Sequence, residues 1–337
     1  MQHRTLGRTG IETGCIGFGG IPLVGLNEEE ASRVLNRALD LGVNFIDTAR
    51  GYRESENLIG KAVSSRRDEF HLATKTKERD EVNILREFKT SLENLRTETV
   101  DLYQIHYVNT DEELEGVLKE GGARPAIRRF QKEGRVRWTG ITGHDSEVLL
   151  KAAKTGEFDT IQGAFSYIER PPAAVELIHY CAENEIGFIV QKPLAGGALL
   201  PATAALKWIL QYPVSVVIPG MLSVEQVEEN VRATEGGFDL TEQEREALEM
   251  VISRLSDKFC RRCYYCQPVC PQKIRIGVVL EFLGKAQIQE NLPLMRRWYS
   301  GMKIQASSCD ECGICLPECP YELPIIDMLK EAHELLG

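Results

Sequence analysis

The stretch DLYQIHY (101–107), RPAIRRFQKEG (124–134) and VRWTGIT (136–142) reads as a strand, a helix and a second strand. The outer segments are short apolar runs of strand length, and the middle segment has apolar residues at helical spacing. Gly134 ends the helix, where a left-handed cap favours glycine. Strands joined by a helix in this way pair in parallel through a right-handed crossover, so the stretch predicts one unit of an α/β sheet.

The same unit recurs over residues 1–235. The other predicted strands are CIGFGG (15–20), NFIDTA (44–49), FHLATK (70–75), FDTIQGAF (158–165), GFIVQKP (187–193) and VSVVIPG (214–220). Further helical patterns are EEEASRVLNRALDLG (28–42), VNILREFKTSLENL (82–95), in which Ile84, Leu85, Phe88, Leu92 and Leu95 form the apolar stripe, and AAVELIHYCAENEIG (173–187). Gly42 and Gly187 are the expected caps of two of them. Eight such units favour a closed (β/α)8 barrel over an open sheet. We expect the opening segment HRTLGRTGIET (3–13) to form a hairpin that plugs the bottom of the barrel.

Two similar cysteine runs follow the repeats, CRRCYYCQPVCP (260–271) and CDECGICLPECP (309–320). Each reproduces the bacterial ferredoxin run, in which three cysteines hold one iron–sulfur cluster and the fourth ligates the other cluster. Zinc ribbons use pairs of Cys-x2-Cys, so a triplet with an outlying fourth cysteine fits zinc less well. The first predicted 4Fe–4S cluster takes Cys260, Cys263, Cys266 and Cys319, and the second takes Cys309, Cys312, Cys315 and Cys270. The remaining cysteines, Cys15 and Cys181, lie in apolar surroundings and are expected to be inert buried thiols.

The fold class that these patterns predict is α/β, a (β/α)8 TIM-type barrel followed by a small, mainly α-helical ferredoxin-like domain. We place the barrel at 1–240, a connector helix at 241–257 and the ferredoxin-like domain with its two 4Fe–4S motifs at 258–337. Within that domain, CPQKIRI (270–276) matches CPYELPI (319–325), and a helical segment follows each. A cysteine loop followed by a helix, used twice, favours a helical two-cluster domain over a compact β-hairpin ferredoxin.

The composition narrows the class of protein. The chain has 337 residues, of which 43% are hydrophobic and 27% charged, which is typical of a globular protein. The net charge of −10 argues against a nucleic-acid partner. No apolar run approaches the ~18 residues of a membrane span, so no membrane partner is expected. The opening MQHRTLGRTG lacks the apolar core of a signal peptide, and reactive thiolates need a reducing compartment, so we expect a cytoplasmic protein.

Polar residues end three consecutive predicted strands. Asp47 ends the second strand, Tyr52 follows in its loop, Lys75 ends the third strand and His106 ends the fourth. Active sites of such barrels lie at the carboxyl ends of the strands, so these side chains are expected to converge. Taken singly, each residue has an ordinary structural explanation, such as a loop cap or a core histidine. Together they form the set that a carbonyl reductase needs.

The chemistry explains why these residue types would act together. Hydride transfer to a carbonyl carbon leaves an alkoxide that needs a proton, and Tyr52 can supply it if its pKa, about 10 unperturbed, is lowered by a nearby ammonium. Lys75 can provide that charge, and Asp47 can position Lys75. His106 can orient or polarise the carbonyl.

The constellation resembles the aldo-keto reductases, and the whole chain resembles the branch that carries a C-terminal two-cluster ferredoxin domain. The matching segments are FIDTARGY (45–52) with Glu56, LATK (72–75), DLYQIH (101–106), GRVRWTGIT (134–142), IQ (161–162), KPL (192–194) and IPG with EQVEEN (218–230). The resemblance implies that Asp47, Tyr52, Lys75 and His106 are the catalytic tetrad. Lys77 competes with Lys75, but Lys75 matches the Thr-Lys of the family and lies nearer the strand end.

The resemblance also implies contacts to a nicotinamide cofactor, with some departures. Thr142 and Gln162 match contacts to the carboxamide, although Gly143 and then His144 replace the asparagine of most members. Gln191 stands where many members stack an aromatic ring on the nicotinamide. Gly220, Met221 and Gln226 stand where many members hold the 2′-phosphate of NADP with cations, which weakens the expected NADP preference and favours NAD. The residues expected to contact the cofactor are Thr142, Gln162, Gln191, Lys192, Leu194, Gly220, Gln226, Glu229 and Asn230, of which Glu229 and Asn230 match the adenine contacts.

The predicted function is an aldo-keto-reductase-like oxidoreductase that uses NAD(P)H to interconvert a small-molecule carbonyl and an alcohol and that carries two 4Fe–4S clusters for electron transfer. Hydride transfer moves two electrons together, whereas each cluster accepts one at a time, so a flavin or a redox partner protein stays open as the mediator. The alternatives are an electron-transfer module that links a ferredoxin or partner subunit to a soluble carrier, and a redox-sensing protein with structural clusters. The segment VNTDEELEGVLKEGG (108–122) is expected to be a specificity loop, and it does not identify the substrate.

Overall fold

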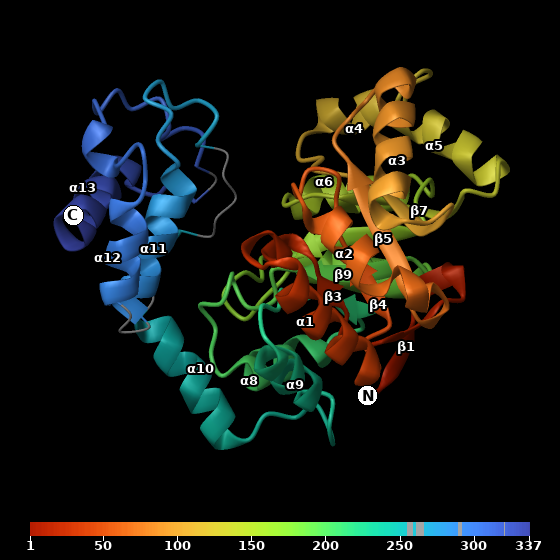
Figure 1. The fold of residues 1–337 in the computed structure, drawn as a ribbon, viewed down its shortest axis with the longest axis horizontal. Helices are drawn as coiled ribbons and strands as arrows, with labels where there is room; N and C mark the ends of the chain where they lie inside the picture. Colours follow the sequence, from red (N-terminus) through yellow and green to blue (C-terminus); the bar gives the residue numbers. More distant parts are fainter. Residues whose placement is uncertain (255–258, 261–265, 289–291, 320) are drawn as a thin grey trace. The chain divides into compact units, whose positions relative to one another are not determined.

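The computed structural model describes residues 1–254, 259–260, 266–288, 292–319 and 321–337, which fall into two compact units. The first unit comprises Met1–Leu194 and Pro201–Thr241, and the second comprises Ala195–Leu200 and Glu242–Gly337. The domain boundaries predicted at 240 and 257 stay a prediction. Each unit is described by itself (Figure 1).

The first unit is built on a parallel sheet. Within the described residues, eight strands follow one another in the order β3 to β10, each paired in parallel with its sequence neighbour. Parallel bridges Ile16–Val217 and Gly19–Gly220 join the two edges, so the sheet closes into the (β/α)8 barrel that the sequence predicts. The strands are β3 (Phe18–Gly19), β4 (Phe45–Asp47), β5 (His71–Thr76), β6 (Val100–Ile105), β7 (Val136–Thr142), β8 (Thr160–Ala164), β9 (Gly187–Gln191) and β10 (Val216–Val217).

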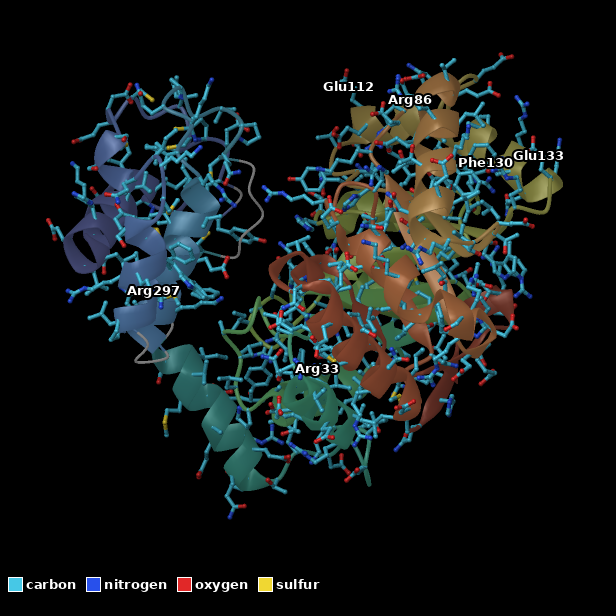
Figure 2. The ribbon with its side chains drawn as sticks, viewed as in Figure 1. Arg33, Arg86, Glu112, Phe130, Glu133 and Arg297 are labelled. Atoms are coloured by element: carbon cyan, nitrogen blue, oxygen red, sulfur yellow. The ribbon has the colours of Figure 1, made fainter. Side chains whose placement is uncertain are left out.

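Helices surround these strands (Figure 1). They are α1 (Glu28–Asp40), α2 (Ser55–Val63), α3 (Glu81–Leu95), α4 (Asp111–Leu118), α5 (Ala123–Lys132), α6 (Ser146–Lys154), α7 (Pro172–Glu183), α8 (Ala202–Leu210) and α9 (Val224–Arg232), with short 3-10 turns at η1 (Gly7–Thr9), η2 (Ile21–Gly25) and η3 (Ser64–Glu69). Their outer faces carry exposed charged side chains such as Arg86, Glu112 and Glu133 (Figure 2). The inner faces bury apolar residues, and Phe130 of α5 stacks on Phe88 of α3 with ring centroids 4.5 Å apart.

The N-terminal hairpin fills the bottom of the barrel, as predicted. Its strands β1 (His3–Thr5) and β2 (Glu12–Gly14) pair antiparallel. Between them, Leu6 and Ile11 are buried in one cluster with inward-facing residues of the barrel strands, among them Phe45 and Ile189. Leu6 lies beside Gly187, the first residue of β9, so the hairpin covers the amino-terminal end of the barrel and leaves the carboxyl ends of the strands for chemistry.

Three local predictions are wrong. Gly187 does not cap α7, because the left-handed residue after that helix is Glu185, at φ 55°. The position of Gly187 requires a glycine for another reason, because a Cβ there would approach the Leu6 side chain to 2.7 Å. Leu85 is 41% exposed, and the buried stripe of α3 runs through Ile84 and Phe88 instead. The segment 108–122, which is expected to be a loop, contains α4. The Thr110 side chain caps the first turn of this helix.

The second unit is mainly helical, as the sequence predicts. Its helices are α10 (Glu242–Arg254), α11 (Ile276–Ile288), α12 (Leu292–Ser300) and α13 (Ile325–Leu336), with the 3-10 turn η4 (Ala306–Ser308). Apolar side chains of α11, α12 and α13 share one core with the cysteine loops, which includes Leu283, Tyr299, Leu329 and Cys315. The Tyr299 hydroxyl accepts a hydrogen bond from the Ala306 amide at 2.9 Å and contacts His333 Nδ1 at 3.0 Å, which ties α12 to both η4 and α13.

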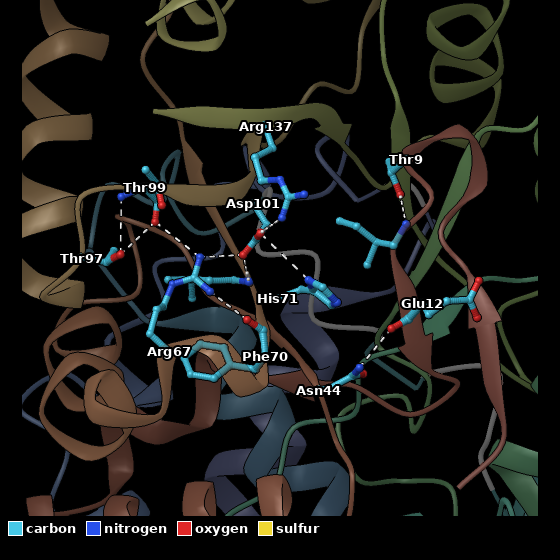
Figure 3. A network of polar contacts seen from close by, with 12 residues as sticks. Thr9, Glu12, Asn44, Arg67, Phe70, His71, Thr97, Thr99, Asp101 and Arg137 are labelled. Atoms are coloured by element: carbon cyan, nitrogen blue, oxygen red, sulfur yellow. Dashed lines mark hydrogen bonds and ion pairs between the residues drawn. The ribbon is translucent and has the colours of Figure 1, made fainter. Parts of the chain in front are cut away.

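A polar network joins neighbouring strands at the amino-terminal end of the barrel (Figure 3). Its centre is Asp101, near the start of β6, which is 5% exposed. One carboxylate oxygen accepts hydrogen bonds from Arg67 at 2.6 Å and the Leu72 amide at 2.9 Å, and the other accepts from Arg137 at 3.2 Å. Burial alone would raise the pKa of Asp101, but hydrogen bonding from His71 and the charge of Arg67 lower it strongly overall. Charged residues at this end of such barrels serve stability.

Replacing Asp101 by asparagine should lower the free energy of unfolding by about 2–4 kcal/mol at pH 7, because buried donors lose their charged acceptor. The folded pKa lies below the unfolded value of about 3.9, so the stabilisation is complete above that value and is lost as the pH falls through the folded pKa. Urea unfolding should therefore show a constant difference between wild type and variant from pH 8 to 5 that shrinks below pH 4. Asp111→Asn, which breaks the exposed ion pair with Lys151, is the control and should cost less than about 1 kcal/mol. A loss no larger than that of the control would contradict the role given to Asp101.

Candidate functional site

Four side chains meet at the carboxyl ends of β4, β5 and β6. Lys75, in β5, is fully buried, and its ammonium donates to Asp47 Oδ2 at 2.5 Å and to the Thr48 carbonyl at 2.8 Å. The same nitrogen lies 5.1 Å from the centroid of the Tyr52 ring. The Tyr52 ring meets the His106 ring edge to face, with centroids 5.6 Å apart. The structure thus brings together the four residues of the expected tetrad, and it places Lys75 rather than Lys77 beside Asp47.

Burial controls the electrostatics of the Asp47–Lys75 pair. It raises the pKa of Asp47 and lowers the pKa of Lys75, and in each case the charge of the partner opposes the shift. Both shifts reduce the difference between the pKa values of Asp47 and Lys75, and this makes it easier for the two groups to share a proton. The ammonium that faces Tyr52 is therefore largely balanced by its own carboxylate.

Tyr52 differs from the expectation of a lowered pKa. Burial, followed by the negative charge of Asp47, raises the pKa of its phenol far above the usual value. The expectation was wrong because burial penalises the charged phenolate, and because the Asp47 carboxylate, 2.5 Å from the Lys75 ammonium, offsets the charge of Lys75. Tyr52 therefore keeps its proton at neutral pH, which is the form that a proton donor needs.

His106 is a neutral imidazole in this environment. Burial lowers its pKa well below the usual value, and the charges of Lys75 and Lys77 lower it further. Its Nδ1 is buried and has no hydrogen-bond partner among the described residues. A neutral ring next to Tyr52 can accept or donate one hydrogen bond to a bound carbonyl or alcohol.

Gln104 is a site residue that the sequence analysis missed. Its amide nitrogen donates to Asp47 Oδ1 at 3.2 Å and to the Gln162 amide oxygen at 2.9 Å. The Gln162 amide nitrogen donates to the Gln191 amide oxygen at 3.5 Å, and Gln191 donates to the Gly143 carbonyl at 2.7 Å. A chain of amides therefore runs through the barrel from the tetrad to the ends of β8 and β9. The alternation of β6, in which Gln104 and His106 share a face, was the signal that could have identified it.

Arg79 is a second residue that was missed. It follows β5, and its guanidinium donates to the carbonyls of Lys77 at 2.8 Å, of His106 at 2.8 Å and of Tyr107 at 3.2 Å. Tyr107 has a left-handed backbone with φ 68°, which is uncommon outside glycine. The bonds from Arg79 hold this strained turn directly beside His106.

The residues expected to contact a cofactor occupy the ends of β7 to β10 and helix α9. Thr142 Oγ1 accepts a hydrogen bond from the Tyr107 amide at 3.2 Å, and Gln162 is 1% exposed. Asn230 is buried in α9, whereas Glu229 is partly exposed. Lys192, which has a left-handed backbone at φ 54°, and Leu194 follow β9. Whether these residues hold a nicotinamide cofactor stays a proposal.

The structure shows the surroundings of two departures from the family pattern, at Gly143 and at the positions expected for the 2′-phosphate. A Cβ at Gly143 would collide with the Val108 carbonyl, so an asparagine does not fit there without a shift of the backbone. At the position expected for the 2′-phosphate, Gly220 is exposed and Met221 is buried. Gln226 uses its amide oxygen to accept from the Leu222 amide at 2.7 Å. These three residues offer no positive charge to a phosphate.

The second unit contains a cavity that matches the second predicted cluster. Cys270, Cys309, Cys312 and Cys315 line one pocket, together with apolar residues such as Ile274 and Leu329. Cys270 comes from the first cysteine run and the other three from the second. Burial raises the pKa of Cys315, and the other three thiolates raise it further, so a positively charged metal centre would favour the ionised thiolates.

The arrangement suits a cluster better than a single ion. Among the described residues, no three His, Cys, Asp or Glu side chains are placed to hold one metal ion. Zinc would require the sulfurs to converge to about 2.3 Å from one point, whereas these thiols surround a cavity. The four cysteines therefore fit the ligand set of a 4Fe–4S cluster.

For the first predicted cluster, the structure describes Cys260, Cys266 and Cys319, while Cys263 lies outside the described residues. Cys266 and Cys319 are buried in the core of the second unit, and Cys260 packs against that core. Cys15 and Cys181 are buried in the first unit, and burial raises the pKa of Cys181 to about 12. These two thiols therefore stay protonated, as expected.

Comparison with family models gives two matches. The model of the aldo/keto reductase family matches residues 15–203, which contain the four converging side chains. The model of the 4Fe-4S dicluster domain matches residues 259–323, which contain all eight predicted cluster cysteines. The part of the chain that the structure describes contains no helix of the length and apolarity that a membrane span requires.

Individual relatives agree with the match to the aldo/keto reductase family. L-galactose dehydrogenase of Arabidopsis thaliana is 29% identical over 283 residues, which cover 69% of this chain and 88% of that protein. The uncharacterized oxidoreductase YqkF of Bacillus subtilis is 25% identical over 303 residues, which cover 74% of this chain and 96% of that protein. Among solved structures, the holo form of the aldo-keto reductase AKR11C1 from Bacillus halodurans matches with a TM-score of 0.64 at 28% identity, covering 74% of this chain and 96% of that one.

Proposed function

Because the chain belongs to the aldo/keto reductase family and also carries a 4Fe-4S dicluster domain, we propose that this oxidoreductase interconverts a small carbonyl compound and an alcohol with a nicotinamide cofactor. The observation that supports this most directly is the buried Lys75–Asp47 pair at 2.5 Å beneath Tyr52, with the neutral His106 ring 5.6 Å from the Tyr52 ring. A phenol and a neutral imidazole then lie in contact at the carboxyl ends of the strands.

In the proposed reaction, each residue of the tetrad has one role. The reduced nicotinamide, when bound, supplies the hydride to the carbonyl carbon. Tyr52 donates its phenolic proton to the carbonyl oxygen, which gives the alcohol, and the Lys75 ammonium stabilises the phenolate that is left. His106 orients the carbonyl oxygen toward Tyr52. The raised pKa of Tyr52 keeps its phenol protonated at neutral pH, which is the form that carbonyl reduction requires.

The direct test is aldehyde reduction with NADH and NADPH by the anaerobically purified protein and by Tyr52→Phe. Loss of activity in the variant supports the tetrad. Equal activity in the variant would remove the tetrad and leave the electron-transfer or redox-sensing alternatives.

We propose that NADPH is not strongly preferred over NADH, since Gly220, Met221 and Gln226 offer no cation to a 2′-phosphate. Fluorescence titration should give dissociation constants for the two cofactors within about tenfold of each other. Gln226→Arg should tighten NADPH binding by about 10- to 100-fold, the range of one charge-assisted hydrogen bond, and leave NADH binding nearly unchanged. A hundredfold preference of the wild type for NADPH would contradict this proposal.

We propose that the clusters exchange electrons with a partner outside the barrel. In the cavity of the second cluster, Cys312 is exposed while Cys315 is buried, so one corner of a cluster held there would face solvent. A reducing compartment such as the cytoplasm suits eight reactive thiolates. The cysteine variants argued in the Discussion test whether the clusters are needed for carbonyl reduction.

A further inference from the structure

Beyond the tetrad, a second lysine lies at the mouth of the barrel. Lys77 comes two residues after Lys75 and is exposed. Its ammonium lies 4.9 Å from the centroid of the Tyr107 ring. The Tyr107 ring in turn meets the His106 ring edge to face, with centroids 6.4 Å apart. One aromatic ring therefore separates the Lys77 ammonium from the histidine of the tetrad.

The charge of Lys77 is not neutralised by a carboxylate. Among the described residues, no ion pair joins Lys77 or Arg79 to an acidic side chain. Carboxylates of Glu78 and Glu113 act on Arg79 only from a distance, and Glu113 accepts a hydrogen bond from the Asn109 amide at 2.7 Å. In a chain with a net charge of −10, Lys77 and Arg79 together form a small positive region. Two neighbouring cations of this kind attract anions and raise their local concentration.

The backbone at this place is held in an uncommon conformation. Tyr107 has φ 68°, and Arg79 donates to its carbonyl and to that of His106. Strained residues persist where the surrounding structure holds them, and they gather at ligand-binding sites. The Tyr107 ring, with Lys77 on one side and His144 edge-on at 5.4 Å, is thereby kept in a fixed position.

The location separates this positive region from the expected cofactor site. Lys77 follows β5, the neighbour of the strand that precedes His106, whereas the residues expected to hold the cofactor follow β7 to β10. In barrels of this kind, phosphate sites are frequently formed by the loops after the last two strands, which are here β9 and β10. An anion bound at Lys77 is therefore better explained as part of the substrate than as a cofactor phosphate.

We propose that the substrate is an anionic carbonyl compound whose carboxylate or phosphate group binds Lys77 while its carbonyl faces Tyr52 and His106. This proposal rests on the proposed reductase function. It makes Lys77 a specificity-determining residue and leaves the tetrad chemistry unchanged. Because Lys77 is exposed and outside the barrel core, its replacement does not threaten folding.

The test compares two matched pairs of substrates in steady-state kinetics with the anaerobically purified full-length protein. Succinic semialdehyde is paired with butanal, and glyceraldehyde 3-phosphate with glyceraldehyde. In at least one pair, the wild type should show a kcat/KM at least about tenfold higher for the anionic member. A preference in the first pair indicates a carboxylate, and a preference in the second pair indicates a phosphate. Lys77→Gln should lower the ratio of anionic to neutral kcat/KM by about 10- to 100-fold, as expected for one charge-assisted hydrogen bond.

The control variant is Lys89→Gln, an exposed lysine of α3, which should keep the wild-type ratio. A ratio near one in the wild type for both pairs, or a ratio that Lys77→Gln leaves unchanged, overturns the proposal. If the wild type reduces none of the four aldehydes, the proposed reductase function is contradicted. The anion site is then tested separately by measuring anion binding. Calorimetric titration with succinate and with inorganic phosphate should then show at least about tenfold weaker binding to Lys77→Gln, and equal binding to both proteins overturns the site.

Discussion

Replacing Tyr52 by phenylalanine should lower kcat/KM for aldehyde reduction by about a thousandfold, the middle of the range for loss of a general acid. The change removes one oxygen and keeps the ring, so the edge-to-face contact with His106 and the position of Lys75 below the ring are retained. The loss should therefore appear mainly in kcat, with cofactor binding nearly unchanged. Steady-state kinetics and fluorescence titration of the cofactor measure the two effects.

Tyr180→Phe is a matched control for this prediction. Tyr180 also has a lysine over its ring, Lys154 at 5.6 Å, but it lies on the outer helix α7. This variant should keep activity within about twofold, because surface changes rarely alter a distant site. If Tyr52→Phe and Tyr180→Phe behave alike, Tyr52 is not the proton donor.

Pairs of cysteine variants should reveal which cysteines share a cluster. The ligand count predicts about eight iron atoms per chain in the wild type. Cys270→Ser with Cys312→Ser removes two ligands of the same proposed cluster, so about four iron atoms should remain. Cys266→Ser with Cys312→Ser removes one ligand from each proposed cluster, and nearly all iron should be lost. Iron and sulfide analysis of the anaerobic proteins measures both.

The opposite result would follow if each cysteine run held its own cluster. Cys270→Ser with Cys312→Ser would then damage both clusters and leave little iron, which contradicts the crossed assignment. Cys181→Ser is the control and should keep all iron, because that thiol is buried in the first unit.

The same variants define what the clusters do. If carbonyl reduction by NADH persists in the iron-depleted protein while reduction by a one-electron donor such as reduced methyl viologen is lost, the clusters serve electron exchange with a partner. Loss of both together with unfolding would instead indicate structural clusters.

Parts of the barrel site could be predicted because they depend on order along the chain. Asp47, Lys75 and His106 end neighbouring strands, and parallel strands bring their carboxyl ends to one edge. The predicted cysteine assignment also depends on order, since the fourth cysteine of each run lies beyond the turn. Cys270 indeed lines a cavity with the cysteines of the second run.

Other parts could not be predicted, because they depend on distances between residues far apart in the chain. The amide chain from Gln104 to Gln191 requires the register of β6, β8 and β9. Gly187 looked like a helix cap, but its size is set by Leu6, a residue of the N-terminal hairpin. Leu85 matched the helical spacing, yet the packing of α3 leaves it at the edge of the buried stripe.

The sequence by itself determined the alternation of strands and helices, the strand-end positions of the tetrad and the spacing of the cysteines, because each is a local or periodic property of the chain. Only the tertiary structure decided the protonation of the site. The Asp47 carboxylate lies 2.5 Å from the Lys75 ammonium, and burial then turns the expected lowering of the Tyr52 pKa into a rise. A pKa depends on burial and on the charges that surround a group in space, and the folded barrel supplies both.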